Sequence, residues 1–142
     1  MTTPSVLFVC VKNGGKSQMA AGLMRQAAGD AVLVDSAGTR PGAAVNGLSA
    51  QVLAEVCVDI TGQTPKAVTD HLLRGADVVV TIGEAQVDPV AGTRVETWQT
   101  DEPFERGIDG IERMRLVRDD LAVRVEHLRA RLLAQDAPVR GS

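Results

Sequence analysis

The sequence predicts a single α/β domain built on a four-stranded parallel sheet that is flanked by helices. Short apolar segments alternate with segments whose apolar residues recur every three or four positions, as in strands that alternate with helices. Residues 77–82 (DVVVTI) are almost entirely apolar, which is typical of a strand buried on both faces of a parallel sheet. The chain of 142 residues has the length of one domain. We expect residues 1–142 to form that domain, with a frayed tail from about residue 136.

The first half of the chain contains two expected strands and two expected helices. Residues 5–10 (SVLFVC) and 31–39 (AVLVDSAGT) are rich in residues that favour strands. Residues 17–28 carry apolar side chains at helical spacing, and Gly29 follows them as a residue that commonly ends helices. Residues 46–58 show the same helical spacing, so the order of strand and helix repeats.

The second half continues this alternation. Asp70 is placed to cap a short helix ahead of the apolar strand. Residues 93–98 (TRVETW) form the fourth expected strand. The longest element has apolar side chains at steps of three or four from residue 111 to residue 132. Asp109 followed by Glu112 predicts a capping box at its start.

Composition and charge exclude several classes of protein. The net charge of −3 gives no field that would attract nucleic acid or an acidic membrane, and no apolar run is long enough to span a bilayer. The chain opens without a basic and then apolar leader, and Cys10 and Cys57, 47 positions apart, make no disulfide framework. We therefore expect a cytoplasmic protein with reduced thiols. His71 and His127 are isolated from other ligands, so we expect no metal site.

The loop after the first strand carries the residues of greatest chemical interest. In the segment VLFVCVKNGGKSQMA, Cys10 ends the strand and a helical pattern begins near Ser17. Ligands of parallel α/β sheets bind beyond the carboxyl ends of the strands, which is where Cys10 is expected. Gly14 and Gly15 allow the unusual backbone conformations and the close approach that let several N–H groups point at one spot.

This loop has the features of a site for a tetrahedral oxyanion. The following helix contributes the positive end of its dipole, and the loop lysines contribute formal charges. The same field should hold Cys10 as a thiolate, which the Ser17 hydroxyl can stabilise by donating a hydrogen bond. Such a thiolate can attack the central atom of the oxyanion. The expected oxyanion ligands are Val11, Lys12, Asn13, Gly14, Gly15 and Lys16.

Two other interpretations compete for this segment. It ends like a nucleotide-binding loop, G-x-x-x-x-G-K-S, in which Lys16 would reach phosphates and Ser17 would bind Mg²⁺. However, Cys10 occupies the position of the first glycine, and the acidic residue of the 77–82 strand stands at its start rather than its end. In the second interpretation Cys10 is simply a small buried apolar residue.

These residues resemble a known family. Cys10, five intervening residues, a basic residue and Ser17 resemble the phosphate loop of the low-molecular-weight protein tyrosine phosphatases, and more closely that of the arsenate reductases that share their fold. The resemblance implies that fold, with Cys10 as nucleophile. It extends over almost the whole chain, and the segments similar to the reductases are 13–20 (NGGKSQMA), 35–39 (DSAGT), 58–66 (VDITGQTPK) and 98–121 (WQTDEPFERGIDGIERMRLVRDDL).

The chain departs from the family pattern at two positions of the site. Lys16 stands where the family usually has arginine, so a point charge replaces a bidentate fork. The family's general acid is an aspartate just before a proline, and the matching residue here is Glu102, preceded by Asp101. The resemblance implies that one of these two carboxyl groups protonates the leaving oxygen. Lys66 replaces an acidic residue of some reductases, and we expect its ammonium to be solvated.

The cysteine complement is a third departure. Thioredoxin-linked reductases of this family carry two further cysteines after the third strand, whereas residues 81–90 contain none. Besides Cys10, the chain has only Cys57, which lies in an apolar run ahead of an expected strand. Free cysteines are usually buried, so we expect Cys57 to be a core thiol far from Cys10. The two electrons that reduce As(V) should then come from an external thiol.

The resemblance implies a particular reaction. Single-cysteine members similar to this chain are arsenate–mycothiol transferases. In these enzymes an arseno–mycothiol adduct forms and is reduced to arsenite by a mycoredoxin, a glutaredoxin-type protein. Mycothiol is then a co-substrate and no cofactor is bound. Two alternatives remain open: a low-molecular-weight phosphomonoesterase or tyrosine phosphatase that uses the same loop, and a non-catalytic oxyanion-binding or sensing protein with an inert Cys10.

Overall fold

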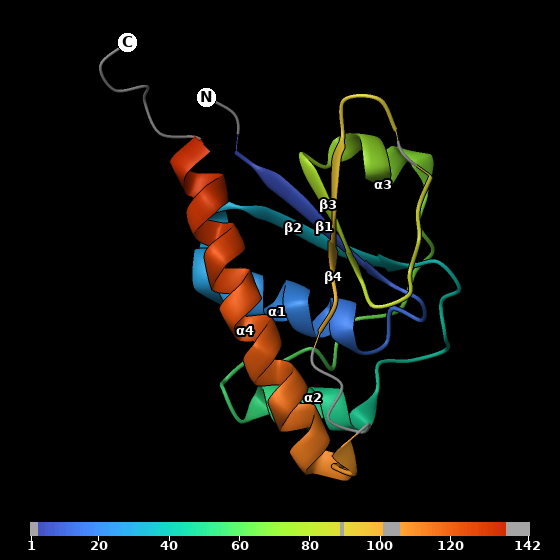
Figure 1. Cartoon of the computed structure of the whole chain (residues 1–142), viewed down its shortest axis with the longest axis vertical. Coiled ribbons are helices and arrows are strands. Elements are labelled where there is room, and N and C mark those ends of the chain that lie inside the picture. Colours follow the sequence, from blue (N-terminus) through green and yellow to red (C-terminus); the bar gives the residue numbers. More distant parts are fainter. Residues whose placement is uncertain (1–2, 89, 101–105, 136–142) are drawn as a thin grey trace.

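The computed structural model describes residues 3–88, 90–100 and 106–135. It contains four strands in one sheet (Figure 1). All neighbouring strands are parallel, in the order β2-β1-β3-β4. The predicted single-domain α/β class with a four-stranded parallel sheet is confirmed. The strands are β1 (Ser5–Cys10), β2 (Leu33–Gly38), β3 (Val78–Ile82) and β4 (Arg94–Trp98).

Helices cover both faces of the sheet, as parallel strands require. α1 (Lys16–Ala28) follows the loop after β1, and a short 3-10 turn (Gly29–Ala31) precedes β2. α4 (Gly110–Gln135) packs beside α1, and α2 (Gly47–Ala54) contacts both of these helices (Figure 1). α3 (Asp70–Gly75) contacts β1. Among the helices in the described ranges, none has both the length and the apolar character needed to cross a membrane.

Alternate residues of β1 contribute to two separate parts of the core. Val6 and Phe8 lie in a large apolar cluster with residues of α1 and α4, whereas Leu7 and Val9 lie in a smaller cluster with Leu73 of α3. All residues of β3 are buried, which confirms the prediction that this strand is covered on both faces. The alternation places the Cys10 side chain on the α1 side of the sheet, in the cluster that contains Phe8.

The segment after α2 differs from the prediction. The helix ends at Ala54, and a turn follows in which Cys57 adopts a left-handed backbone conformation (φ 65°). A residue in this conformation commonly closes a helix, which explains why the helix is shorter than expected. The prediction that Cys57 is a core thiol is wrong, because its side chain is exposed. Val58 and Ile60 fill the core instead, without forming a strand.

Two helix caps also differ from expectation. Thr69 rather than Asp70 caps α3, because its hydroxyl oxygen accepts the N–H of Leu72 at 3.1 Å. At the start of α4, the Asp109 carboxylate accepts the N–H of Gly110 (2.7 Å), while Glu112 pairs with an arginine of its own helix. These two side chains therefore do not form the predicted capping box.

Ion pairs fix the end of α2 against α4. Glu55 lies 2.7 Å from Arg115 and 2.8 Å from Arg118, two residues one turn apart on α4. The hydrogen bond from Arg115, together with the bond from Arg118, lowers the pKa of Glu55 to about 2. This contact anchors α2, and with it the end of the long connection that runs from β2 past the candidate site.

Candidate active site

The carboxyl ends of three strands meet at a pocket that contains Cys10. The pocket has a volume of about 530 Å³, within the range of ligand sites in proteins. Cys10 is the last residue of β1, and the other lining residues come from the loop that follows it and from the ends of β3 and β4. The site therefore lies at the edge of the sheet that the topology predicts. Its lining residues are Cys10, Val11, Lys16, Ile82, Gly83, Glu84 and Gln99.

The backbone of the loop is held by the segment 39–46. A carbonyl and the next N–H of a trans peptide point in opposite directions, and the described chain contains no cis peptide. The N–H groups of residues 11, 12, 13 and 15 therefore point away from this segment, and that of residue 13 reaches Cys10 Sγ. The loop therefore leaves these N–H groups free of the segment 39–46, and one of them faces the cysteine. The bonds that hold it are Thr39 N to Cys10 O (3.1 Å), Arg40 N to Val11 O (2.8 Å), Gly42 N to Lys12 O (2.9 Å) and Asn46 N to Gly14 O (2.6 Å).

The start of α1 adds to this group of donors. Its N-cap residue is Gly15, which has no side chain to satisfy the first N–H groups, and no acidic residue lies in the first turn. These N–H groups and the helix dipole therefore favour an anion. Lys16, the first residue of the helix, lines the cysteine pocket and adds a formal charge.

Close backbone packing explains two glycines of the site. A Cβ on Gly14 would lie 2.9 Å from the carbonyl oxygen of Ala44, and a Cβ on Gly38 would lie 2.7 Å from that of Val11. The unusual backbone conformation of the loop falls on Asn13 (φ 54°), not on the glycines as expected. Asparagine tolerates this conformation better than most residues.

The orientation of the Asn13 amide follows from its hydrogen bonds beside Cys10. The Lys66 backbone N–H can only donate, so the Asn13 atom 3.0 Å away is Oδ1. Asn13 Nδ2 therefore donates to Ser17 Oγ (2.7 Å), and this arrangement allows the Ser17 hydroxyl to donate to Cys10 Sγ 2.9 Å away. The Asn13 backbone N–H also donates to Sγ (3.2 Å). Cys10 Sγ is therefore within hydrogen-bond distance of the Ser17 hydroxyl and of one backbone N–H of the loop.

Lys66 contributes through its backbone rather than its charge. Its N–H holds Asn13 Oδ1, while its ammonium pairs with Asp35 at 2.6 Å. The expectation of a solvated ammonium is therefore only partly right: both side chains are exposed, but they are paired. Exposed ion pairs of this kind contribute about 0–1 kcal/mol to stability. The hydrogen bond from the Lys66 N–H to Asn13 Oδ1 therefore matters more to the site.

The structure brings some of the predicted site residues together, and others lie outside the described residues. Cys10, Ser17 and the loop residues 11–16 come together as described above. Asp101 and Glu102, the two candidates for the general acid, lie outside the described residues. Glu84 was missed: this exposed carboxylate follows β3 and lines the cysteine pocket. It follows Gly83, whose φ of 70° marks a turn at the strand end, and this glycine is the signal that would have found it.

The described aromatic side chains take no part in the pocket. Phe8 and Trp98 are both buried and pack together with their ring centroids 5.6 Å apart. Phe104 lies outside the described residues. The described lining of the cysteine pocket therefore contains no aromatic ring.

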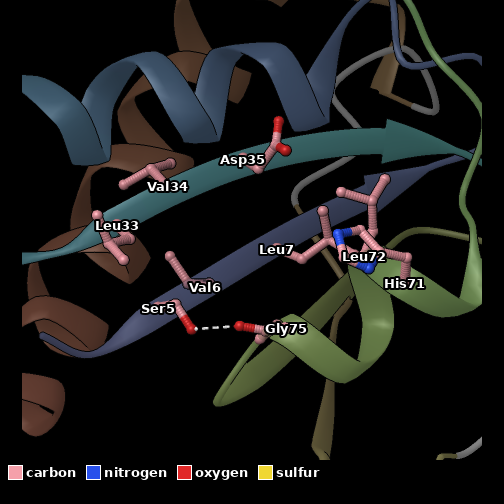
Figure 2. Close-up of a pocket in the computed structure, with 10 residues that line it drawn as sticks. Ser5, Val6, Leu7, Leu33, Val34, Asp35, His71, Leu72 and Gly75 are labelled. Carbon is pink, nitrogen blue, oxygen red and sulfur yellow. Dashed lines mark hydrogen bonds between the residues drawn. The ribbon is translucent and has the colours of Figure 1, made fainter. Parts of the chain in front are cut away.

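A smaller hollow lies away from this chemistry. It has a volume of about 270 Å³ and is lined by the starts of β1 and β2 and by α3. Figure 2 shows Ser5, whose hydroxyl donates to the carbonyl of Gly75 (2.9 Å), and the largely apolar wall around it. Ser5 begins β1 and Cys10 ends it, so the hollow lies toward the opposite end of that strand from the candidate site.

The fold and the loop define a class of protein: parallel α/β domains in which a backbone loop after the first strand surrounds a cysteine thiol. The chain matches the family described as low molecular weight phosphotyrosine protein phosphatase over residues 5–137, and it belongs to this family. Over 135 residues it is 30% identical to an arsenate reductase of Staphylococcus aureus, and the match covers 92% of this chain and 100% of that protein.

Solved structures agree with this assignment. A thioredoxin-dependent arsenate reductase of Corynebacterium glutamicum matches with a TM-score of 0.79 and 32% identity, over 93% of this chain and 63% of that longer chain. An arsenate reductase in a phosphate-binding state matches with a TM-score of 0.78 and 28% identity, over 91% of this chain and 98% of that one.

Proposed function

We propose that this protein is an arsenate reductase that takes its electrons from an external low-molecular-weight thiol. Its similarity to arsenate reductases along almost the whole chain supports the substrate. One observation carries the choice of electron source. Cys10 Sγ lies among donors in an oxyanion loop, and the second cysteine of the chain is out of its reach.

Cys57 and Cys10 lie beside different parts of α1, which supports the inference that the two thiols cannot meet. The segment that contains Cys57 packs on the later part of the helix, since a Cβ on Gly22 would meet Val58 at 2.9 Å and Gln26 Nε2 donates to Val56 O at 2.8 Å. Cys10 contacts Ser17, five to nine residues earlier on the same helix. At 1.5 Å per residue the axial separation is about 8–14 Å, beyond the roughly 7 Å that a disulfide allows between Cα atoms.

The chemistry then proceeds in three balanced steps. The Cys10 thiolate attacks arsenic, an As–S bond forms, and one oxygen leaves as water after protonation by Asp101 or Glu102. An external thiol replaces Cys10 on arsenic, which frees the Cys10 thiolate. A second thiol then attacks the sulfur of the adduct, so that two thiols become one disulfide and As(V) becomes arsenite. The loop N–H groups and Lys16 hold the oxyanion, and Ser17 stabilises the Cys10 thiolate each time it is released.

We assign mycothiol as the external thiol and a mycoredoxin as the second one. The cysteine pocket, with a volume of about 530 Å³, has room for part of such a molecule, and it offers Glu84 and Gln99 as polar partners for hydroxyl groups. No bound cofactor takes part in these steps. Since the reaction consumes reduced thiols, we propose that it takes place in the cytoplasm.

An assay of arsenite production with purified protein tests the proposal. The reductants compared are mycothiol with mycoredoxin, glutathione with glutaredoxin, and thioredoxin with its reductase. We expect turnover with the mycothiol system, no turnover in Cys10→Ser, and near-normal turnover in Cys57→Ser. Efficient turnover with thioredoxin alone, or loss of turnover in a folded Cys57→Ser protein, contradicts the external-thiol mechanism.

A phosphomonoesterase is the second candidate, because the family description and the loop both fit phosphate. The described lining of the pocket has no aromatic ring to hold a phosphotyrosine, so we propose that aryl phosphates are poor substrates and that phosphate competes with arsenate. Hydrolysis at about 1 per second or faster would favour this candidate. A non-catalytic binding protein would instead bind arsenate equally well in Cys10→Ser and form no arsenite with any thiol.

A further inference from the structure

A second pocket of about 640 Å³ adjoins the oxyanion loop. Lys16 lines both this pocket and the cysteine pocket, so the two are neighbours. The walls of the 640 Å³ pocket come from the loop, from the segment 40–46, and from the starts of α2 and α4. Four of its lining residues are cationic, and no acidic residue is among the described ones that line it. The cationic residues are Lys12, Lys16, Arg40 and Arg113.

This gathering of cations is unusual for the chain. The net charge of the whole chain is −3, so carboxylates outnumber cations overall. Within the part of the chain that the structure describes, neither Lys12 nor Arg40 forms an ion pair. Lys12 and Arg40 carry like charges that line one pocket and repel each other, and a bound anion would relieve this repulsion.

Backbone hydrogen bonds join the segments that carry two of these cations. Arg40 N donates to Val11 O (2.8 Å) and Gly42 N donates to Lys12 O (2.9 Å), so the backbones that carry Arg40 and Lys12 are joined directly. Met114 and Val117 of α4 give the pocket an apolar wall. The cations therefore line a formed cavity and are not scattered over a flat surface.

We propose that this pocket binds a second anionic group of a small ligand whose first group occupies the oxyanion loop. The ligand class is a small molecule with two phosphate groups. This goes beyond arsenate reduction, because arsenate has one oxyanion and needs no second site. The proposal also predicts which phosphate compounds the loop accepts. Cations lie beside the loop, where a tyrosine phosphatase would need aromatic rings, so we expect compounds with a second phosphate to bind better than aryl phosphates.

Calorimetric titration tests this inference in a Cys10→Ser background, which prevents turnover. The ligands are fructose 6-phosphate and fructose 1,6-bisphosphate, which differ by one phosphate. We expect the bisphosphate to bind about tenfold more tightly at low salt, as two partly exposed ion pairs would give. Arg40→Gln should reduce this advantage to about threefold or less, with the monophosphate affinity changed less than about twofold.

Arg74→Gln is the matched control, because it removes an exposed arginine of α3 outside the pocket. It should leave the bisphosphate advantage unchanged, which separates a local effect from a change in net charge. If Arg40→Gln does not fold, Lys12→Gln replaces it; because Lys12 is also an expected oxyanion ligand, only the ratio of the bisphosphate and monophosphate affinities is compared in that variant. Equal affinity for the two ligands, or an advantage that persists in both pocket variants, overturns the proposal. The readout is binding, so the result does not depend on whether the protein reduces arsenate.

Discussion

Removing the Ser17 hydroxyl tests the hydrogen-bond network around the thiol. Ser17 is fully buried and lies 2.9 Å from Cys10 Sγ, so water cannot easily replace the lost donor in Ser17→Ala. A hydrogen bond to a charged group contributes about 1.5–3 kcal/mol. At about 1.4 kcal/mol per factor of ten, the rate of thiolate attack should fall about 10-fold to 150-fold.

Two measurements check this magnitude. The first is kcat/KM for arsenate with the external thiol in excess. The second is the rate at which iodoacetamide alkylates Cys10 at neutral pH, measured in a Cys57→Ser background because Cys57 is exposed and would also react. Both rates report on the thiolate, so both should fall together.

Ser49→Ala is the matched control. Ser49 is as buried as Ser17, and its hydroxyl bonds to Asn46 Oδ1 (3.3 Å) instead of to the thiol. The Ser49→Ala protein should lose about 1 kcal/mol of stability, which is what a neutral hydrogen bond contributes to folding. Its Cys10 should keep an alkylation rate within about twofold of the wild type, because Ser49 does not bond to the thiol. If Ser17→Ala reacts as fast as the wild type, the sulfur does not depend on this donor and the argument fails.

Three further predictions concern the loop and its supports. Lys16→Arg should bind phosphate about three- to tenfold more tightly in calorimetry, because a guanidinium fork replaces a point charge; weaker binding would contradict this. Gly38→Ala should cost about 1–3 kcal/mol of stability and weaken phosphate binding, because its Cβ would lie 2.7 Å from Val11 O. Gly62→Ala is the control and should have neither effect, because a Cβ there would have no neighbour within 4 Å. Equal melting temperatures of the two variants would refute the clash. Glu55→Gln should unfold at lower urea than the wild type at neutral pH. Since the folded pKa of Glu55 is lowered from 4.5 to about 2, this difference should be full above pH 4.5 and disappear as the pH falls toward 2; a difference that does not depend on pH would exclude the ion pairs as its cause.

The sequence by itself determined the elements and the place of the site. Short apolar runs predict the strands, and apolar residues spaced three to four apart predict the helices, each from a short stretch of chain. The parallel order then follows from their alternation, and it places the end of the first strand, and so Cys10, at the ligand-binding edge. The loop motif consists of consecutive residues, so the family resemblance needs no knowledge of contacts between distant segments. The missing cysteines of residues 81–90 are likewise a property of the sequence alone.

The tertiary structure decided how distant segments meet. Lys66 lies 53 positions from Asn13, yet its N–H sets the orientation of the Asn13 amide, whose Nδ2 then donates to Ser17 Oγ beside Cys10. Cys57 looked like a core residue in an apolar run, but the turn after α2 exposes it. The cationic pocket also required the folded chain, because Arg40 belongs to a connection whose position no local pattern indicates. Local periodicity reports which face of an element is buried, whereas these contacts depend on how loops pack against elements far away in sequence.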